Sequence, residues 1–233
     1  DRQPEKQKKQ DISVQGKEEK YISRRSRFKS LLLDKDFEPE NPKKLEELGF
    51  EKNDLIKLKK AINSPQGMVL VTGPTGSGKT TTLYSILKDI SNPTINILTA
   101  EDPVEFDLEG IGQVKIREDI NFTFEKALRS FLRQDPEVIL IGEMRDKITV
   151  DTALKASLTG HLVFSTLHTN NALASIIRLL DMETPNYLIS SALSLVIAQR
   201  LVRRLCSECR EVDETATPKL LSSIGIDPSK SSR

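Results

Sequence analysis

The stretch that decides the fold is "MVLVTGPTGSGKT", residues 68–80, where an apolar run leads directly into a glycine-rich loop. Residues 68–72 have the composition of a buried β-strand, and apolar residues recur at helical spacing from residue 83 to residue 90. Between them, Gly73–Thr80 fits the pattern G-x-x-x-x-G-K-[ST]. A strand, a glycine-rich loop of this pattern and a helix, in that order, predict a loop that binds phosphate groups.

The residue types of this loop explain how it would bind phosphate. Gly73, Gly76 and Gly78 allow the backbone to curl so that successive N–H groups converge on phosphate oxygens. The Lys79 ammonium can neutralise the β- and γ-phosphates, and the Thr80 hydroxyl can ligate Mg²⁺. A glycine-rich turn that merely begins a helix is the simpler alternative, which the complete pattern in the right context disfavours. We therefore expect nine nucleotide-binding residues: Gly73, Pro74, Thr75, Gly76, Ser77, Gly78, Lys79, Thr80 and Thr81.

Strands and helices alternate on both sides of this loop. The apolar strands lack a polar face, which is typical of a mostly parallel sheet covered by helices on both faces, an α/β fold. Two short helices separated by Gly49 are expected between residues 45 and 62. Further strands are expected at residues 95–99, 137–141 and 162–166, and further helices at about 124–132, 148–159, 171–181 and 185–202.

Composition divides the chain into three parts. Residues 1–44 are rich in charge and poor in large apolar side chains, which predicts a charged tail or the remnant of a preceding domain. Residues 45–205 form the expected core, and residues 206–233 lose the apolar pattern. No signal peptide and no apolar run of about 20 residues is visible, so we expect a cytoplasmic protein. The net charge of +1 gives no sign of nucleic-acid binding.

Two acidic stretches follow predicted strands. "TAEDPVEF" contains Glu101, Asp102 and Glu105, and "VILIGEMRD" places Glu143 after four apolar strand residues. Parallel α/β sheets bind their ligands at the carboxyl ends of the strands, where these acids are expected. Either stretch alone could be an ordinary polar strand end, but beside a phosphate loop both are candidates for metal binding and for activating water.

The two histidines lie on opposite sides of one predicted strand. His168 follows residues 162–166 closely and could contact the γ-phosphate or orient the carboxylates. His161 precedes the strand, so we expect it at the opposite edge of the sheet with a structural role.

Together these motifs resemble those of the secretion ATPase superfamily, which drives type II secretion and type IV pilus assembly. Four segments carry the resemblance, over about residues 45–212: "GPTGSGKTTTLY" is similar to the Walker A motif, "TAEDPVEF" to the Asp box, "LRQDPEVILIGEMRD" to Walker B and "TGHLVFSTLHTNNA" to the His box. The resemblance implies a RecA-like P-loop NTPase core in a hexameric, Mg²⁺-dependent ATPase. It also implies a position on the cytoplasmic face of the bacterial inner membrane, and an inner-membrane platform protein as partner.

The resemblance also implies residue roles. Glu101 would be the catalytic base, Glu143 the Walker B carboxylate and His168 the His-box residue. Thr80 and Glu143 would hold Mg²⁺, with ATP as the nucleotide. Type II secretion and pilus assembly share every motif quoted above, so the choice between them stays open.

The only two cysteines, Cys206 and Cys209, resemble half of a tetracysteine zinc motif of the secretion and pilus-assembly branch. Structural zinc requires four ligands, and this chain supplies two thiols with no histidine after them. We therefore expect bound Zn²⁺ only in a longer parent chain, and the chain itself to be a fragment.

Other functions stay open at this stage. Family arginines from a preceding domain reach the nucleotide of a neighbouring subunit, and Arg24, Arg25 or Arg27 could replace them, although a solvated basic tail is the simpler interpretation. Because loss of such arginines would lower turnover, a nucleotide-binding or assembly module that does not hydrolyse ATP is a second hypothesis. A small-molecule kinase lacks a visible acceptor site, and a DNA translocase lacks the basic character for tracking phosphates.

Overall fold

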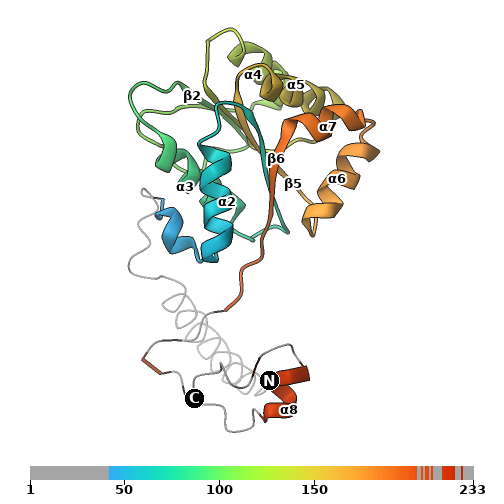
Figure 1. Ribbon diagram of the computed structural model, residues 1–233. Helices are drawn as coiled ribbons and strands as arrows, with labels where there is room; N and C mark the ends of the chain where they lie inside the picture. The colour runs from blue at the N-terminus through green and yellow to red at the C-terminus, as the bar shows by residue number, and fades with distance from the viewer. Residues whose placement is uncertain are drawn as a thin grey trace, which may run out of the picture. The chain divides into compact units, whose positions relative to one another are not determined.

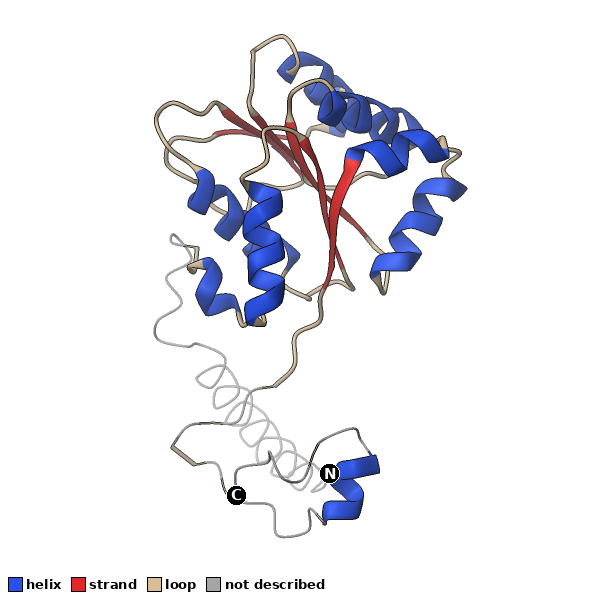
Figure 2. Ribbon diagram, viewed as in Figure 1, coloured by secondary structure: helices blue, strands red, loops and turns tan. Residues whose placement is uncertain are grey.

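A computed structural model describes residues 42–203, 206, 208–209, 211, 217–223 and 227. Six parallel strands form one sheet with the order β3-β2-β4-β5-β1-β6, which Figure 2 shows between layers of helices. The strands are β1 (Gly67–Thr72), β2 (Ile97–Glu101), β3 (Gly112–Lys115), β4 (Val138–Ile141), β5 (Leu162–Leu167) and β6 (Leu193–Ala198). The predicted α/β fold is confirmed, and every described strand pair is parallel.

Helices cover both faces of the sheet (Figure 1). The described helices are η1 (Leu45–Leu48), α2 (Lys52–Ile62), α3 (Lys79–Ile90), η2 (Glu118–Ile120), α4 (Phe124–Phe131), α5 (Lys147–Leu158), α6 (Ala172–Asp181), α7 (Asn186–Ala192) and α8 (Pro218–Ser223). Helices α2 and α3 contact β1 on one face, whereas α4, α5 and α7 pack on the other.

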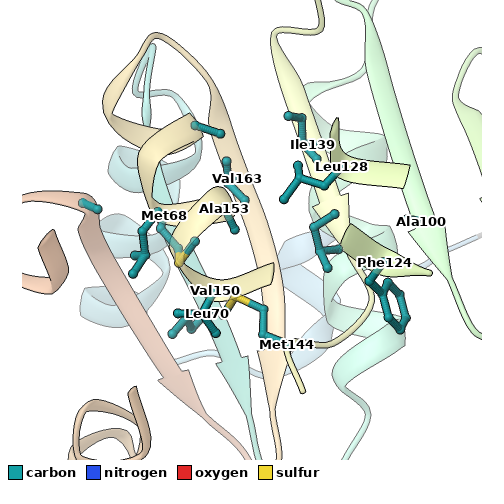
Figure 3. Close-up of a cluster of buried hydrophobic side chains, with 14 of the residues drawn as sticks. Met68, Leu70, Ala100, Phe124, Leu128, Ile139, Met144, Val150, Ala153 and Val163 are labelled. Carbon is teal, nitrogen blue, oxygen red and sulfur yellow. The ribbon is translucent and has the colours of Figure 1, made fainter. Parts of the chain in front are cut away.

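Each face of the sheet has its own apolar core, because successive strand residues point to opposite sides. In β1, Met68 and Leu70 pack under α4, α5 and α7, while Val69 and Val71 pack against α2 and α3. Figure 3 shows Met68 and Leu70 in the first of these clusters. All six residues of β1 are buried, so the strand that precedes the phosphate loop is held from both sides.

Short polar side chains begin three of the helices on the second face. Thr123, Asp146 and Asn171 each accept a hydrogen bond from the backbone N–H three residues later, at the starts of α4, α5 and α6. Such caps satisfy N–H groups that have no partner within the helix. The predicted cap at Gly49 is also confirmed, since this residue ends η1 in the left-handed conformation with φ 86°.

One sequence-based expectation is wrong, and one strand was not predicted. The helix predicted at 185–202 ends at Ala192, and Leu193–Ala198 continue as strand β6 along the free edge of β1. The pairing gives partners to the backbone N–H and C=O groups on that edge of β1. Val196 and Ile197 are also β-branched residues, which favour strands. Strand β3 was not predicted because Gly112–Lys115 has no apolar alternation, and it forms by pairing with β2.

The chain separates into two compact units, residues 1–199 and residues 200–233. The tail expected at residues 1–44 lies, except for residues 42–44, outside the described residues, and so do Arg24, Arg25 and Arg27. Across the described residues, no helix combines the length and apolar character that a membrane crossing requires.

We expect Phe164→Ala to lower the free energy of unfolding by about 3–5 kcal/mol, because Phe164 is fully buried in β5 and its loss leaves a cavity. Urea denaturation measures this change. Leu173→Ala is the control, since Leu173 is 74% exposed on α6, and it should leave the midpoint almost unchanged. Equal effects of both substitutions would contradict the described core.

Candidate nucleotide-binding site

The parallel direction of the strands brings their carboxyl ends to one edge of the sheet. The phosphate loop follows β1 there, Glu143 follows β4 and His168 follows β5. Since β5 lies between β1 and β4, residues that are distant in sequence become neighbours. This edge is where open parallel sheets bind ligands.

The loop has the conformation that its glycines predict. Gly73, Gly76 and Gly78 have φ values of 147°, 75° and 85°, in the left-handed region that favours glycine. Helix α3 begins directly after Gly78, and no side chain caps its first N–H groups. Uncapped helix N–H groups beside a curled glycine loop are suited to binding an anion.

The Lys79 ammonium lies within this loop. Its Nζ donates to the carbonyl oxygens of Gly73 at 3.0 Å and Pro74 at 3.1 Å. Burial lowers the pKa of Lys79 from its ordinary value, and the Glu143 carboxylate opposes this shift. Glu143 follows β4 and Lys79 follows the loop after β1, so the two residues lie at the same edge of the sheet.

Glu143 has two partners at the sheet edge. One carboxylate oxygen forms an ion pair with Arg145, and the other lies 3.3 Å from His168 Nε2. Arg145 also lies 3.6 Å from Asp102 and 3.6 Å from Glu118. The bond to Glu143, which is the main cause, raises the pKa of the Arg145 guanidinium. The guanidinium thus joins the ends of β2 and β4.

Backbone contacts fix the path of the chain as it leaves β4. The Gly142 N–H donates to the Ala100 carbonyl oxygen at 2.8 Å, and the Gly142 carbonyl oxygen accepts from Thr166 Oγ1 at 2.7 Å. A Cβ on Gly142 would lie 3.2 Å from the Ala100 oxygen, so a larger residue would crowd β2. Glu143 is therefore presented from a segment that is bonded to both neighbouring strands.

The segment after β5 is bonded to the strand that precedes the phosphate loop. Thr72 Oγ1 donates to the Thr169 carbonyl oxygen at 2.8 Å and accepts from the Thr169 N–H at 3.2 Å. This holds His168, the preceding residue, beside the loop. His161 lies at the other end of β5, with Nδ1 3.0 Å from the Ala156 carbonyl oxygen, in agreement with the expected structural role.

Glu101 lies in the interior rather than at the surface of the site. It is 4% exposed, and its carboxylate accepts hydrogen bonds from Tyr84 and Thr99 and from Gln113 Nε2 at 3.2 Å. Burial and the Glu101 bond raise the pKa of Tyr84 well above its usual range. The Tyr84 hydroxyl also accepts from the Glu105 N–H at 3.3 Å. The network joins α3 to the segment that follows β2.

The cysteines do not form a closed metal site among the described residues. Cys206 and Cys209 are both exposed free thiols. Nowhere in the described part of the chain do three or more His, Cys, Asp or Glu side chains gather around a point that could hold a metal ion. Because structural zinc needs four ligands, the described residues do not fit a complete zinc site.

A phosphate loop between a buried parallel strand and its helix, with carboxylates at adjacent strand ends, defines a P-loop NTPase core of the RecA-like type. Residues 35–233 match the family described as type II/IV secretion system protein. The chain belongs to this family.

The chain is similar to several members of known name. It is 54% identical over 183 residues to the type IV pilus assembly ATPase PilB of Myxococcus xanthus, which covers 78% of this chain and 32% of the relative. It is 50% identical over 184 residues to the type II secretion system protein E of Pseudomonas aeruginosa, which covers 79% of this chain and 36% of the relative. The chain thus spans about a third of the length of these relatives.

A solved structure supports the same fold. The pilus retraction motor PilT with bound ADP matches with a TM-score of 0.63 and 40% identity, covering 70% of this chain and 49% of that chain. This likeness confirms the expected RecA-like core.

Sequence reasoning assigned no role to three polar residues at this edge. Arg145 follows the Walker B carboxylate by two residues in "GEMRD", which is a signal that the sequence contains. Tyr84 and Gln199 are recognised only from their contacts, because their partners lie 17 or more positions away in sequence.

Tyr84→Phe is expected to lower the free energy of unfolding by about 1–3 kcal/mol, because the buried Glu101 carboxylate loses a hydrogen-bond donor. Denaturant titration at neutral pH would measure the change. Tyr187→Phe removes the same hydroxyl from a residue that is 72% exposed and should have no effect. If both variants are equally stable, the hydrogen bonds around Glu101 contribute nothing to the free energy of unfolding.

Proposed function

We propose that this chain is the ATP-hydrolysing core of a motor that powers type II protein secretion or type IV pilus assembly. The observation that carries the proposal is the position of Lys79 and Glu143 at one edge of the sheet, beside a loop with the G-x-x-x-x-G-K-[ST] pattern. Two relatives are named as a pilus assembly ATPase and a secretion system protein, and these names support secretion or pilus assembly as the process that the motor powers.

The nucleotide phosphates would bind the Lys79 ammonium and the backbone N–H groups of residues 73–81, except Pro74, which has none. Thr80 and Glu143 would hold Mg²⁺, and their hydroxyl and carboxylate oxygens are the hard ligands that this ion prefers. When bound, the ion neutralises charge on the β- and γ-phosphates. Arg145 and His168, which contact Glu143, would keep its carboxylate directed at the loop.

The general base must contact the attacking water, so we choose it among the three acids of "TAEDPVEF" by their exposure. Glu101, the residue expected for this role, is nearly buried with its oxygens bonded to side chains, which does not favour contact with water. Asp102 lies beside Arg145, whereas Glu105 is exposed and forms no ion pair within the described residues. We therefore propose Glu105 as the base and Glu101 as the residue that holds its segment in place.

The assembly is proposed from the family alone. We propose that residues 45–205 form the ATPase core of a homo-hexamer at the cytoplasmic face of the bacterial inner membrane, with a membrane platform protein as its partner and no nucleic acid. In a longer parent chain, Cys206 and Cys209 would supply half of a zinc site. A preceding domain of the parent would supply the arginines that reach a neighbouring nucleotide.

Lys79→Ala and Glu143→Gln are each expected to lower Mg²⁺-dependent phosphate release at least about 100-fold. Lys79→Ala removes a positive charge that neutralises the phosphates, and Glu143→Gln removes a carboxylate that would hold Mg²⁺. The exposed Lys155→Ala on α5 is the matched control for lost lysine charge. The rate per subunit should rise with protein concentration if subunits act together. Saturable ATP binding without phosphate release at any concentration would favour the non-hydrolysing assembly module.

Glu105→Gln is expected to lower the turnover number about 100-fold or more while changing nucleotide affinity less than about threefold, the behaviour of a lost general base. Glu101→Gln retains an acceptor for Tyr84 and should lower turnover less than about tenfold. Steady-state ATPase assays beside nucleotide titrations compare the two variants. The reverse order of effects would return the base role to Glu101.

A further inference from the structure

Gln199 follows β6 directly and forms three hydrogen bonds in and around the phosphate loop. Its backbone N–H donates to the Thr72 carbonyl oxygen at 2.9 Å, which continues the pairing of β6 with β1. Its side-chain Nε2 donates to the Ser77 carbonyl oxygen at 2.8 Å, and its Oε1 accepts from Thr82 Oγ1 at 3.0 Å. One residue therefore bonds to the strand before the loop, to the loop and to the helix after it.

Chemistry fixes the orientation of the Gln199 amide. The Ser77 carbonyl oxygen can only accept a hydrogen bond, so the NH₂ group must face it. The amide oxygen then faces Thr82, whose hydroxyl can donate and which is 4% exposed. Neither a carboxylate nor an apolar side chain of the same length can satisfy both partners.

The bond to Ser77 determines where the next N–H group points. The peptide between Ser77 and Gly78 is planar and trans, so its C=O and N–H point in opposite directions. Gln199 draws the Ser77 carbonyl towards β6, and the Gly78 N–H is thereby directed to the opposite side of the loop. Gly78 also precedes the first turn of α3, so this N–H belongs to the set available to an anion.

Close packing prevents the loop from shifting towards Gln199. A Cβ on Gly73 would lie 2.3 Å from the Gln199 carbonyl oxygen and 2.6 Å from Ser77 Oγ. Real Cβ atoms do not approach backbone oxygens so closely, so only glycine allows β6 and the loop to lie at this distance. The amide of Gln199 and the missing side chain of Gly73 together fix the loop against β6.

We propose that Gln199 is a positioning residue of the nucleotide site, which holds the Ser77–Gly78 peptide so that the Gly78 N–H faces the phosphates. The proposal rests on the proposed function only in taking a nucleotide phosphate as the ligand. Gln199, at the end of β6, would therefore raise the affinity of the loop for phosphate without contacting the nucleotide itself.

The test is Gln199→Met, which keeps the side-chain length but has no amide. The Kd of a fluorescent ADP analogue with Mg²⁺ should rise about 10-fold, because the Ser77 carbonyl loses its donor and the loop its orientation. The KM for ATP should rise by the same factor with kcat changed less than about threefold, as expected when binding is lost equally from the ground and transition states.

Three further variants separate positioning from general stability. Thr82→Ser keeps the hydroxyl and should bind nucleotide as the original chain does, whereas Thr82→Val should weaken binding about threefold. Gln66→Met removes an exposed amide from the opposite end of β1 and should change neither binding nor turnover. Thermal unfolding of each variant establishes that it is folded.

The results that would overturn the positioning role of Gln199 differ from those that would refute the ATPase motor. An unchanged Kd in folded Gln199→Met, or a fall in kcat with KM unchanged, overturns the positioning role. If Gln199→Met does not fold, equal binding by Thr82→Val and Thr82→Ser overturns it instead. If the original chain binds the ADP analogue but does not hydrolyse ATP, the motor is refuted, whereas a higher Kd in Gln199→Met still supports the positioning role. If the original chain binds no nucleotide, both the motor and the positioning role are overturned.

Discussion

The parallel pairing of β1 with β5 and β6 is the constraint on which the rest of the structure depends. Because all described strands run in one direction, every segment that leaves a strand at its carboxyl end reaches the same edge. The phosphate loop, His168 and Gln199 follow three adjacent strands and therefore meet there. Burial of β1 on both faces gives the loop a fixed base, and its glycines adopt the positive φ values that the turn requires.

Charge at this edge is balanced through specific partners. Lys79 loses hydration by burial and is held by two carbonyl oxygens of its own loop, with Glu143 close enough to oppose the fall in its pKa. Glu143 in turn shares its oxygens between Arg145 and His168. Charged groups that are held in place need little reorganisation when a charged ligand binds, which suits the proposed nucleotide site.

Hydrogen bonds and ion pairs join the four family motifs. Thr72 links the strand before the phosphate loop to the His box through Thr169, and Tyr84 links α3 to the Asp box through Glu101 and Glu105. Arg145 spans the Asp box and Walker B. The proposed motor would need such connections to couple a change at the phosphates to movement.

The sequence by itself determined the alternation of strands and helices, the phosphate loop and the strand-end acids, because these depend on local patterns of apolar residues and glycine. It did not determine that Leu193–Ala198 form a strand or that Gly112–Lys115 join the sheet, since both are stabilised by backbone pairing with distant strands. Which of the acids is buried, and which amide supports the loop, was likewise decided only by tertiary structure. Burial and hydrogen bonding of Glu101 and Gln199 arise from partners that no short stretch of sequence contains.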